Sequence, residues 1–317
     1  MQVKKLFTAT ALSFTAMCMT HAAHAQDILK KTLRDTVLQE RHLLITGGFD
    51  GMKALQALFP GKYYNLSEAK YDNRFISWTC PSCKAIPYTD VNEDGGQSFP
   101  YEDGVATRLL SVLDFTDSAG GQYKMLAFSH SAYDPDGGRT GRFVGGLLGL
   151  AKFTKTPAGW LLRGFSPTIG AYGAFSSCPS PTLLKIGADQ YAFLVTHNNG
   201  PGGGPFDESY FLIAGANGAY REVLAVTQTT RVQPEDGCSL WKSSITVTGD
   251  KKYFRDIVVT TKGTYHFCQD DFIPGDIMER MKGIKSCTFS LTRRYVYGAK
   301  GYVQQPITDF AMTGVKR

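Results

Sequence analysis

The chain has 317 residues, with 34 lysines and arginines against 28 aspartates and glutamates, a formal net charge of +6. Hydrophobic residues make up 43% and charged residues 20%, which excludes an intrinsically disordered chain and a strongly polyanion-binding one. A chain of this length can bury its core as one large β domain or two smaller ones.

The first 25 residues have the pattern of an export signal. Lys4 and Lys5 precede an apolar stretch over residues 6–19, and Ala23 and Ala25 place small side chains at the −3 and −1 positions of a cleavage site. The apolar stretch is too short to cross a bilayer stably, and no later stretch is long enough. We therefore expect a soluble periplasmic or secreted protein, cleaved near Ala25, with no membrane span.

Residues 27–59 are the only substantial helical region that the sequence predicts. Asp27 is expected to cap a helix with Leu29, Leu33 and Val37 on one face. Residues 53–59 are expected to add a short second helix. The predicted organisation is a signal peptide over 1–25, an N-terminal helical segment with a Cys-x-x-Cys and acidic loop region over 26–104, and a β-repeat region over 105–317. The last two regions are expected to form one continuous domain.

Cleavage of the signal leaves six cysteines, an even number that in an exported chain indicates disulfide bonds. Cys80 and Cys83 form a Cys-x-x-Cys pair, for which redox catalysis and zinc binding are alternatives to a structural bridge. We predict the structural bridge, because Pro87 interrupts the helix that a redox motif needs and no second such pair exists. The pairing we expect joins nearest neighbours: Cys80 with Cys83, Cys178 with Cys238, and Cys268 with Cys287.

Antiparallel β structure is predicted from about residue 105, where the hydrophobic period changes to two and turn residues recur. Three units follow, each made of a strand, a tight turn, a strand, a long loop, a strand, a turn and a strand. They span roughly residues 105–170, 182–229 and 243–305. One such unit cannot bury both of its faces, so neighbouring units must pack together. The sequence therefore predicts an all-β, mainly antiparallel fold with a short N-terminal helical segment, either β-propeller-like or built of packed twisted sheets.

The long loops of these units are the expected recognition surface, because stacking in register brings equivalent loops to one end. His130 and His197 end equivalent strands of the first two units. One interpretation makes these histidines metal ligands or general bases; the one we prefer makes them polar strand-end residues repeated by duplication. The candidate ligand-binding residues are His130, Asp134, Asp136, Arg139, His197, Asn198, Asn199, Asp207 and Glu208.

An acidic turn before the first unit has half of a calcium-binding pattern. Asp90, Asn92 and Asp94 offer oxygen ligands at alternate positions, and Gly95 follows them. The second half of the pattern is missing, because Tyr101 stands where a glutamate is needed. Calcium and a simple solvated turn both remain open, and no other cofactor is expected.

Catalytic templates such as Gly-x-Ser-x-Gly and His-Glu-x-x-His are absent from the sequence. We therefore expect a binding module rather than an enzyme: an exported β protein that grips a protein or glycan of the cell envelope through its long loops, as an inhibitor or immunity protein does. The alternative is a metal-assisted hydrolase of envelope polymers centred on His130 and His197. Export argues against nucleic acid as a partner.

Overall fold

The computed structural model describes residues 29–70, 72–92, 96–132, 141–200, 206–233, 238–268 and 272–317. The predicted signal peptide with its cleavage site at Ala25 lies outside these residues. Three predicted loop residues and one predicted calcium ligand lie outside them too: Asp134, Asp136, Arg139 and Asp94. Within the described ranges, no helix has the length and apolar character needed to cross a bilayer.

The N-terminal segment corrects one prediction. Instead of a long helix, it forms β1 (Lys31–Thr32), a 3₁₀ turn η1 (Asp35–Leu38) and β2 (Leu44–Ile45). The expected apolar side chains Leu33 and Val37 are buried even so. β1 pairs with β4, and β2 pairs with β10. The segment therefore satisfies the hydrogen bonds of its backbone by joining the first sheet. The spacing of its apolar residues does not reveal these partners, because they are distant in the sequence.

The short second helix is present as α1 (Gly51–Leu58). Its N-cap is Asp50, whose Oδ1 accepts a hydrogen bond from the backbone N–H of Lys53 at 2.8 Å. The helix buries Leu55 and Leu58 against the first sheet. Pro60 follows the end of the helix, as the sequence predicts.

The three repeat units form three sheets, which confirms the all-β, mainly antiparallel prediction. The first sheet has the strand order β1-β4-β7-β8-β9-β10-β2, with β3 and β11 attached at its sides. Its remaining strands are β3 (Lys62–Asn65), β4 (Arg74–Thr79), β7 (Val105–Thr116), β8 (Gln122–Ala132), β9 (Gly146–Thr156), β10 (Gly159–Ser166) and β11 (Ala171–Tyr172). A small separate hairpin consists of β5 (Pro87–Thr89) and β6 (Gly96–Ser98).

The second and third sheets repeat the same four-stranded order. The second consists of β12 (Thr182–Lys185), β13 (Tyr191–Asn199), β14 (Phe206–Ala216) and β15 (Ala219–Gln233). The third consists of β16 (Leu240–Thr248), β17 (Asp256–His266), β18 (Ser286–Tyr297) and β19 (Tyr302–Gln304), with β20 (Asp309–Lys316) on β18. Between β17 and β18 lie α2 (Gly275–Met278) and a 3₁₀ turn η2 (Glu279–Met281).

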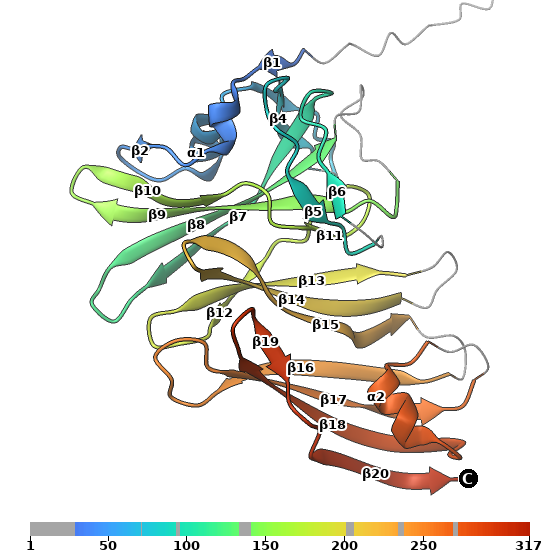
Figure 1. Ribbon diagram of the computed structural model, residues 1–317. Helices are drawn as coiled ribbons and strands as arrows, with labels where there is room; N and C mark the ends of the chain where they lie inside the picture. The colour runs from blue at the N-terminus through green and yellow to red at the C-terminus, as the bar shows by residue number, and fades with distance from the viewer. Residues whose placement is uncertain are drawn as a thin grey trace, which may run out of the picture.

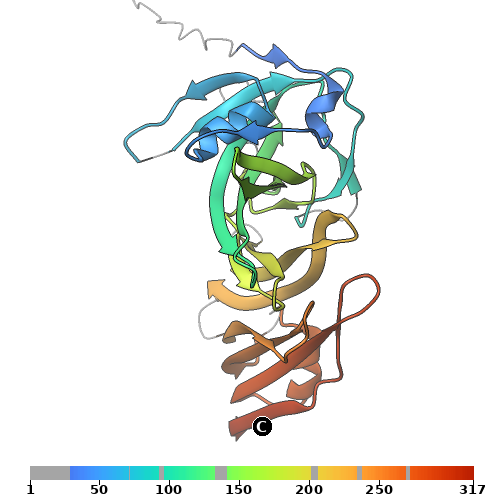
Figure 2. The same cartoon turned by 90° about the vertical axis from the view of Figure 1, so that its left-hand side faces the viewer.

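The sheets stand in a row rather than closing into a ring, so the packed-sheet form of the prediction is the correct one (Figure 1; Figure 2). Met125 and Phe193 belong to the core between the first and second sheets, and Leu224 and Val259 to the core between the second and third. The outer face of the third sheet is polar, with Lys242, Lys262, Thr264 and Thr288 exposed. A polar outer face of this kind does not need a further sheet packed against it.

The disulfide pairing is correct for one bridge and wrong for the other two. Cys80 and Cys83 are bonded as expected, whereas Cys238 bonds to Cys268. Cys178 and Cys287 are free and buried. The reason is strand pairing: β16 and β17 are antiparallel neighbours in which Leu240 faces Thr264, so the residues just before β16 and just after β17 meet at one edge.

Removal of the Cys238–Cys268 bridge by a double serine substitution is expected to lower the free energy of unfolding by about 3.5 kcal/mol. The bridge closes a loop of 30 residues, and the entropy that it removes from the unfolded chain grows with loop length. The matched double serine substitution at Cys80 and Cys83 should lower the free energy of unfolding by only about 1.5 kcal/mol, because that bridge joins cysteines with a sequence separation of 3. Urea unfolding of the oxidised proteins measures both, and equal losses would contradict the loop-length argument.

Candidate functional site

His130 lies in a closed core beneath α1. Its side chain is fully buried, and its Nδ1 is 2.8 Å from the hydroxyl oxygen of Thr107. The rings of Phe59 and Trp78 pack edge-on against the imidazole, with centroids 5.0 and 5.7 Å away. Burial lowers the pKa of His130 to about 3, so the imidazole is neutral at physiological pH.

His197 lies elsewhere, at the interface between the first and second sheets. Its Nδ1 accepts a hydrogen bond from the backbone N–H of Gly173 at 2.9 Å, and its ring packs against Phe211 of β14. Burial lowers the pKa of His197, and the negative charge of Asp90 partly opposes this shift. The two histidines therefore belong to different cores. Among the described residues, no group of three or more His, Cys, Asp or Glu side chains is placed to hold a metal ion.

Asp90 and Asn92 of the acidic turn join the loops of the first and second sheets. One carboxylate oxygen of Asp90 accepts the N–H of Gly145 at 2.8 Å, and the other accepts the backbone and side-chain N–H groups of Asn92. Asn92 in turn accepts a hydrogen bond from the side chain of Asn199. Both carboxylate oxygens of Asp90 thus face N–H donors, and calcium binding at this turn stays a prediction.

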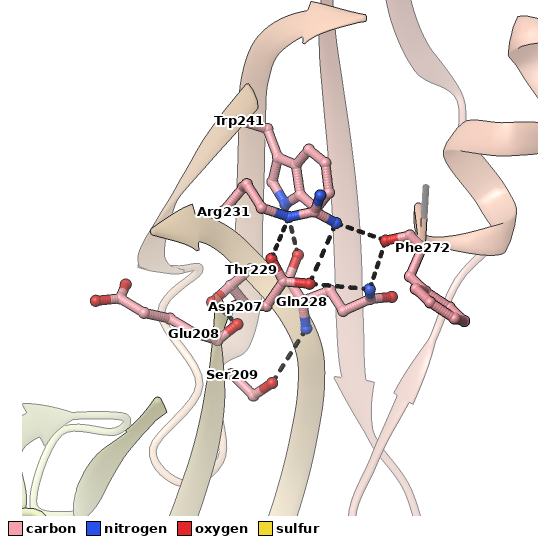
Figure 3. A network of polar contacts seen from close by, with 8 residues as sticks. All are labelled: Asp207, Glu208, Ser209, Gln228, Thr229, Arg231, Trp241 and Phe272. Carbon is pink, nitrogen blue, oxygen red and sulfur yellow. Dashed lines mark hydrogen bonds and ion pairs between the residues drawn. The ribbon is translucent and has the colours of Figure 1, made fainter. Parts of the chain in front are cut away.

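A polar network around Arg231 joins Asp207 at the start of β14 to Phe272 in the segment between β17 and α2 (Figure 3). The Arg231 side chain is fully buried and its Nε lies 2.5 Å from Oδ1 of Asp207, whose side chain is 14% exposed. Nη2 of Arg231 donates to the carbonyl oxygen of Phe272 at 2.6 Å. The guanidinium also lies 4.2 Å from the ring centroid of Trp241, a cation–π contact.

Gln228 completes this network and belongs to β15. Its side-chain amide donates to Asp207 at 3.1 Å and to the Phe272 carbonyl at 2.8 Å. The backbone carbonyl of Gln228 accepts the indole N–H of Trp241 at 2.8 Å. The residue has φ of 51° and stands where the β14–β15 register shifts. The network therefore holds the far end of β15 against the loop before α2.

The remaining predicted loop residues have simple positions. Asn198 is exposed at the end of β13 and pairs in register with Glu208 of β14. The carbonyl oxygen of Glu208 accepts a hydrogen bond from the hydroxyl of the buried Thr229. Two of the predicted loop residues that the structure describes therefore belong to separate junctions, one between Asn199 and Asn92 and one around Asp207 and Arg231.

A groove that the sequence does not predict follows β15. We call it the edge trough: it has a volume of about 690 Å³ on the side of the third sheet and continues as a second hollow of about 350 Å³ on the side of the first sheet. Glu222 and Thr227 of β15 line both parts. The walls come from α2, β18 and β19 on one side and from the β5 turn and the segment before β11 on the other, including Asp276, Arg293, Tyr295, Lys300, Tyr302, Asp90, Ile169 and Tyr172.

Charges in the edge trough are mostly compensated. Arg293 forms two hydrogen bonds of 2.6 Å with Asp276. The hydroxyl of Tyr172 donates to Glu222 at 2.8 Å; burial raises the pKa of this carboxyl and the hydrogen bond partly opposes the rise. Lys300 is exposed and forms no ion pair within the described ranges. The lining of the edge trough therefore contains the ammonium group of Lys300, which has no ion-pair partner among the described residues, together with the carboxyl groups of Glu222 and Asp90.

No sequence signal identifies the edge trough, because the residues of β15 alternate like those of any half-buried strand. Only the position of β15 at the end of the order β12-β13-β14-β15 leaves one of its sides open. Comparisons of this chain with protein-family models, with curated proteins and with solved structures give no match. The geometry of the edge trough and of the junctions beside it is therefore what indicates a function.

Proposed function

We propose that this chain is an exported binding protein that grips a protein or glycan of the cell envelope, as inhibitor and immunity proteins do. The observation that carries the proposal is the edge trough, a groove of about 690 Å³ whose walls come from strands of separate sheets. A groove of this size, lined by aromatic and polar side chains, is suited to holding part of a larger molecule.

Rigid support around the edge trough favours this function. Gln228 at the end of the trough is held by hydrogen bonds to Asp207 and to the Phe272 carbonyl, and Tyr172 holds Glu222 from the opposite wall. A binding surface whose side chains are already fixed loses less conformational entropy when its partner docks. The polar junctions thus favour tight binding.

Export is supported by two features. The signal-like pattern over residues 1–25 predicts translocation, and the Cys80–Cys83 and Cys238–Cys268 bridges suit an oxidising compartment. The alternative of a metal-assisted hydrolase has no specific observation in its favour. His130, one of its two central residues, is fully buried and packed against aromatic rings.

A pull-down from envelope extract tests the proposal, with the chain from residue 26 immobilised. Wild type is expected to retain a partner, and Thr227→Arg is expected to retain about tenfold less, because Thr227 lines both parts of the edge trough. The matched control is Thr246→Arg, which adds the same side chain to an exposed position of β16. Absence of any partner at micromolar concentrations, or equal retention by the two variants, would contradict the proposed function.

A further inference from the structure

The open side of β15 points to a particular kind of partner. We propose that the partner presents an extended peptide segment that adds to β15 as a further antiparallel or parallel strand. This inference rests on the proposed binding function and specifies its ligand as a protein backbone rather than a glycan. It starts from the position of β15, which pairs with β14 on one side and is the last strand of its sheet.

The alternation of backbone pairs that starts at the hairpin turn determines which residues of β15 face outward. Ala216 and Ala219 close the two-residue turn at Asn217 and Gly218, and such a closing pair exchanges both hydrogen bonds. Hydrogen-bonded and non-hydrogen-bonded pairs then alternate, so the Ile213–Glu222 pair is non-hydrogen-bonded.

A register shift follows this pair, with Leu212 opposite Leu224 and Val223 as the extra residue. Beyond it, Leu224 and Val226 turn their backbone groups toward β14, and Ala225 and Thr227 turn theirs away. Ala225 and Thr227 are also exposed. Each of these two residues therefore offers an N–H and a C=O to an incoming strand.

The available edge is short and has defined ends. At one end Gly301 lies against Val223: a Cβ on this glycine would be 2.7 Å from the Val223 carbonyl oxygen. At the other end the carbonyl of Gln228 already accepts the Trp241 indole N–H. Between them, the described residues outside β14 form no backbone hydrogen bond to residues 224–227. Four residues of strand span roughly 13 Å, which sets the length of the segment that pairs.

The chemistry of the edge selects a peptide. Alternating donors and acceptors at strand spacing match the backbone of another extended chain, the mode of recognition known as β-strand addition. The small side chain of Ala225 leaves room above the edge, and the ammonium group of Lys300 lines the same trough. Because Lys300 has no ion-pair partner within the described ranges, we infer that the peptide carries a carboxylate side chain beside the paired segment.

The test uses a phage-displayed library of linear peptides of about 12 residues, selected against the immobilised chain from residue 26. We expect selected peptides that contain β-branched residues and an acidic residue. Replacement of Ala225 by proline removes an outward N–H at an edge position, where proline is tolerated, and should weaken peptide binding about tenfold by calorimetry. The control Ala225→Thr keeps the N–H and should bind within about threefold of wild type.

A second measurement keeps the test decisive should Ala225→Pro fail to fold, which circular dichroism will show. N-methylation of the selected peptide, one amide at a time, should weaken binding to wild type at every second position, because only alternate amides of an added strand face β15. On binding, the Ala225 amide should also gain protection from hydrogen exchange.

Several outcomes would overturn the inference. Uniform effects of N-methylation, or undiminished binding by a folded Ala225→Pro variant, would show that the peptide does not pair with β15. If the envelope pull-down retains a partner that Thr227→Arg loses but Ala225→Pro keeps, the binding function stands and strand addition is wrong. A purified chain that dimerises through Ala225 would assign the edge to a second copy, and glycan binding without protection of the Ala225 amide would assign the edge trough to a carbohydrate.

Discussion

Replacement of His130 by leucine is expected to remove much of the acid sensitivity of this protein. The wild-type imidazole is buried, with a pKa lowered from 6.5 to about 3, whereas in the unfolded chain it takes up a proton near its ordinary pKa of about 6.5. Between these two pH values the unfolded state binds one more proton than the folded state. The contribution of His130 to stability is therefore complete above pH 6.5 and is lost as the pH falls toward 3.

The size of the effect follows from linkage. As the pH falls from about 6.5 to about 3, His130 alone should lower the free energy of unfolding by about 1.4 kcal/mol per pH unit. The total decrease over this range is ~5 kcal/mol. Urea unfolding between pH 4 and pH 8 measures the slope directly. His130→Leu should flatten it even if the variant is less stable at neutral pH.

Other groups leave a residual slope in the His130→Leu variant. Hydrogen bonds from Tyr123 and Lys251 hold the pKa values of Asp117 and Asp256 below their ordinary range, and burial lowers the pKa of His197. The matched control is His42→Leu, at an exposed position, which should keep the wild-type slope. An unchanged slope in His130→Leu would contradict the burial of a neutral imidazole.

Replacement of Asp207 by alanine is expected to lower the free energy of unfolding by about 3–5 kcal/mol. The Arg231 side chain is fully buried and forms an ion pair with the carboxylate of Asp207. Without that carboxylate, the guanidinium charge loses this ion pair in the interior and keeps neutral neighbours such as the Phe272 carbonyl and the Trp241 ring. A buried charge that loses its partner costs much more than the pair itself contributes.

Two comparisons isolate this effect from ordinary substitution costs. Asp114→Ala removes a carboxylate that pairs with Lys124 but is 69% exposed, and it should cost at most ~1 kcal/mol. Combining Asp207→Ala with Arg231→Met should recover part of the loss, because the uncompensated charge is then absent. Chemical denaturation measures the free energy of unfolding of all three variants. Similar small losses of stability in Asp207→Ala and Asp114→Ala would contradict the prediction and show that Arg231 is hydrated.

The candidate site could be predicted only in its parts. The polar composition after a strand identifies loop residues such as Asn199 and Asp207. Asn199 bonds to Asn92 of the acidic turn, and Asp207 bonds to Arg231, which in turn reaches the Phe272 carbonyl. Their roles as junctions were not predictable, because the partners Asn92 and Arg231 are distant in sequence. The edge trough was not predicted at all, since which strand of a unit is left open is decided by how the sheets pack.

Local alternation of polar and apolar residues was enough to determine the three four-stranded units, because each tight turn joins strands that are neighbours in the chain. The Cys80–Cys83 bridge was equally local, with two residues between the cysteines. Tertiary structure decided the rest: whether Leu33 packs from a helix or from a segment that joins a sheet, which cysteine reaches Cys238, and how deeply His130 is buried. These outcomes depend on contacts between residues far apart in the chain, whose free energy no local pattern contains.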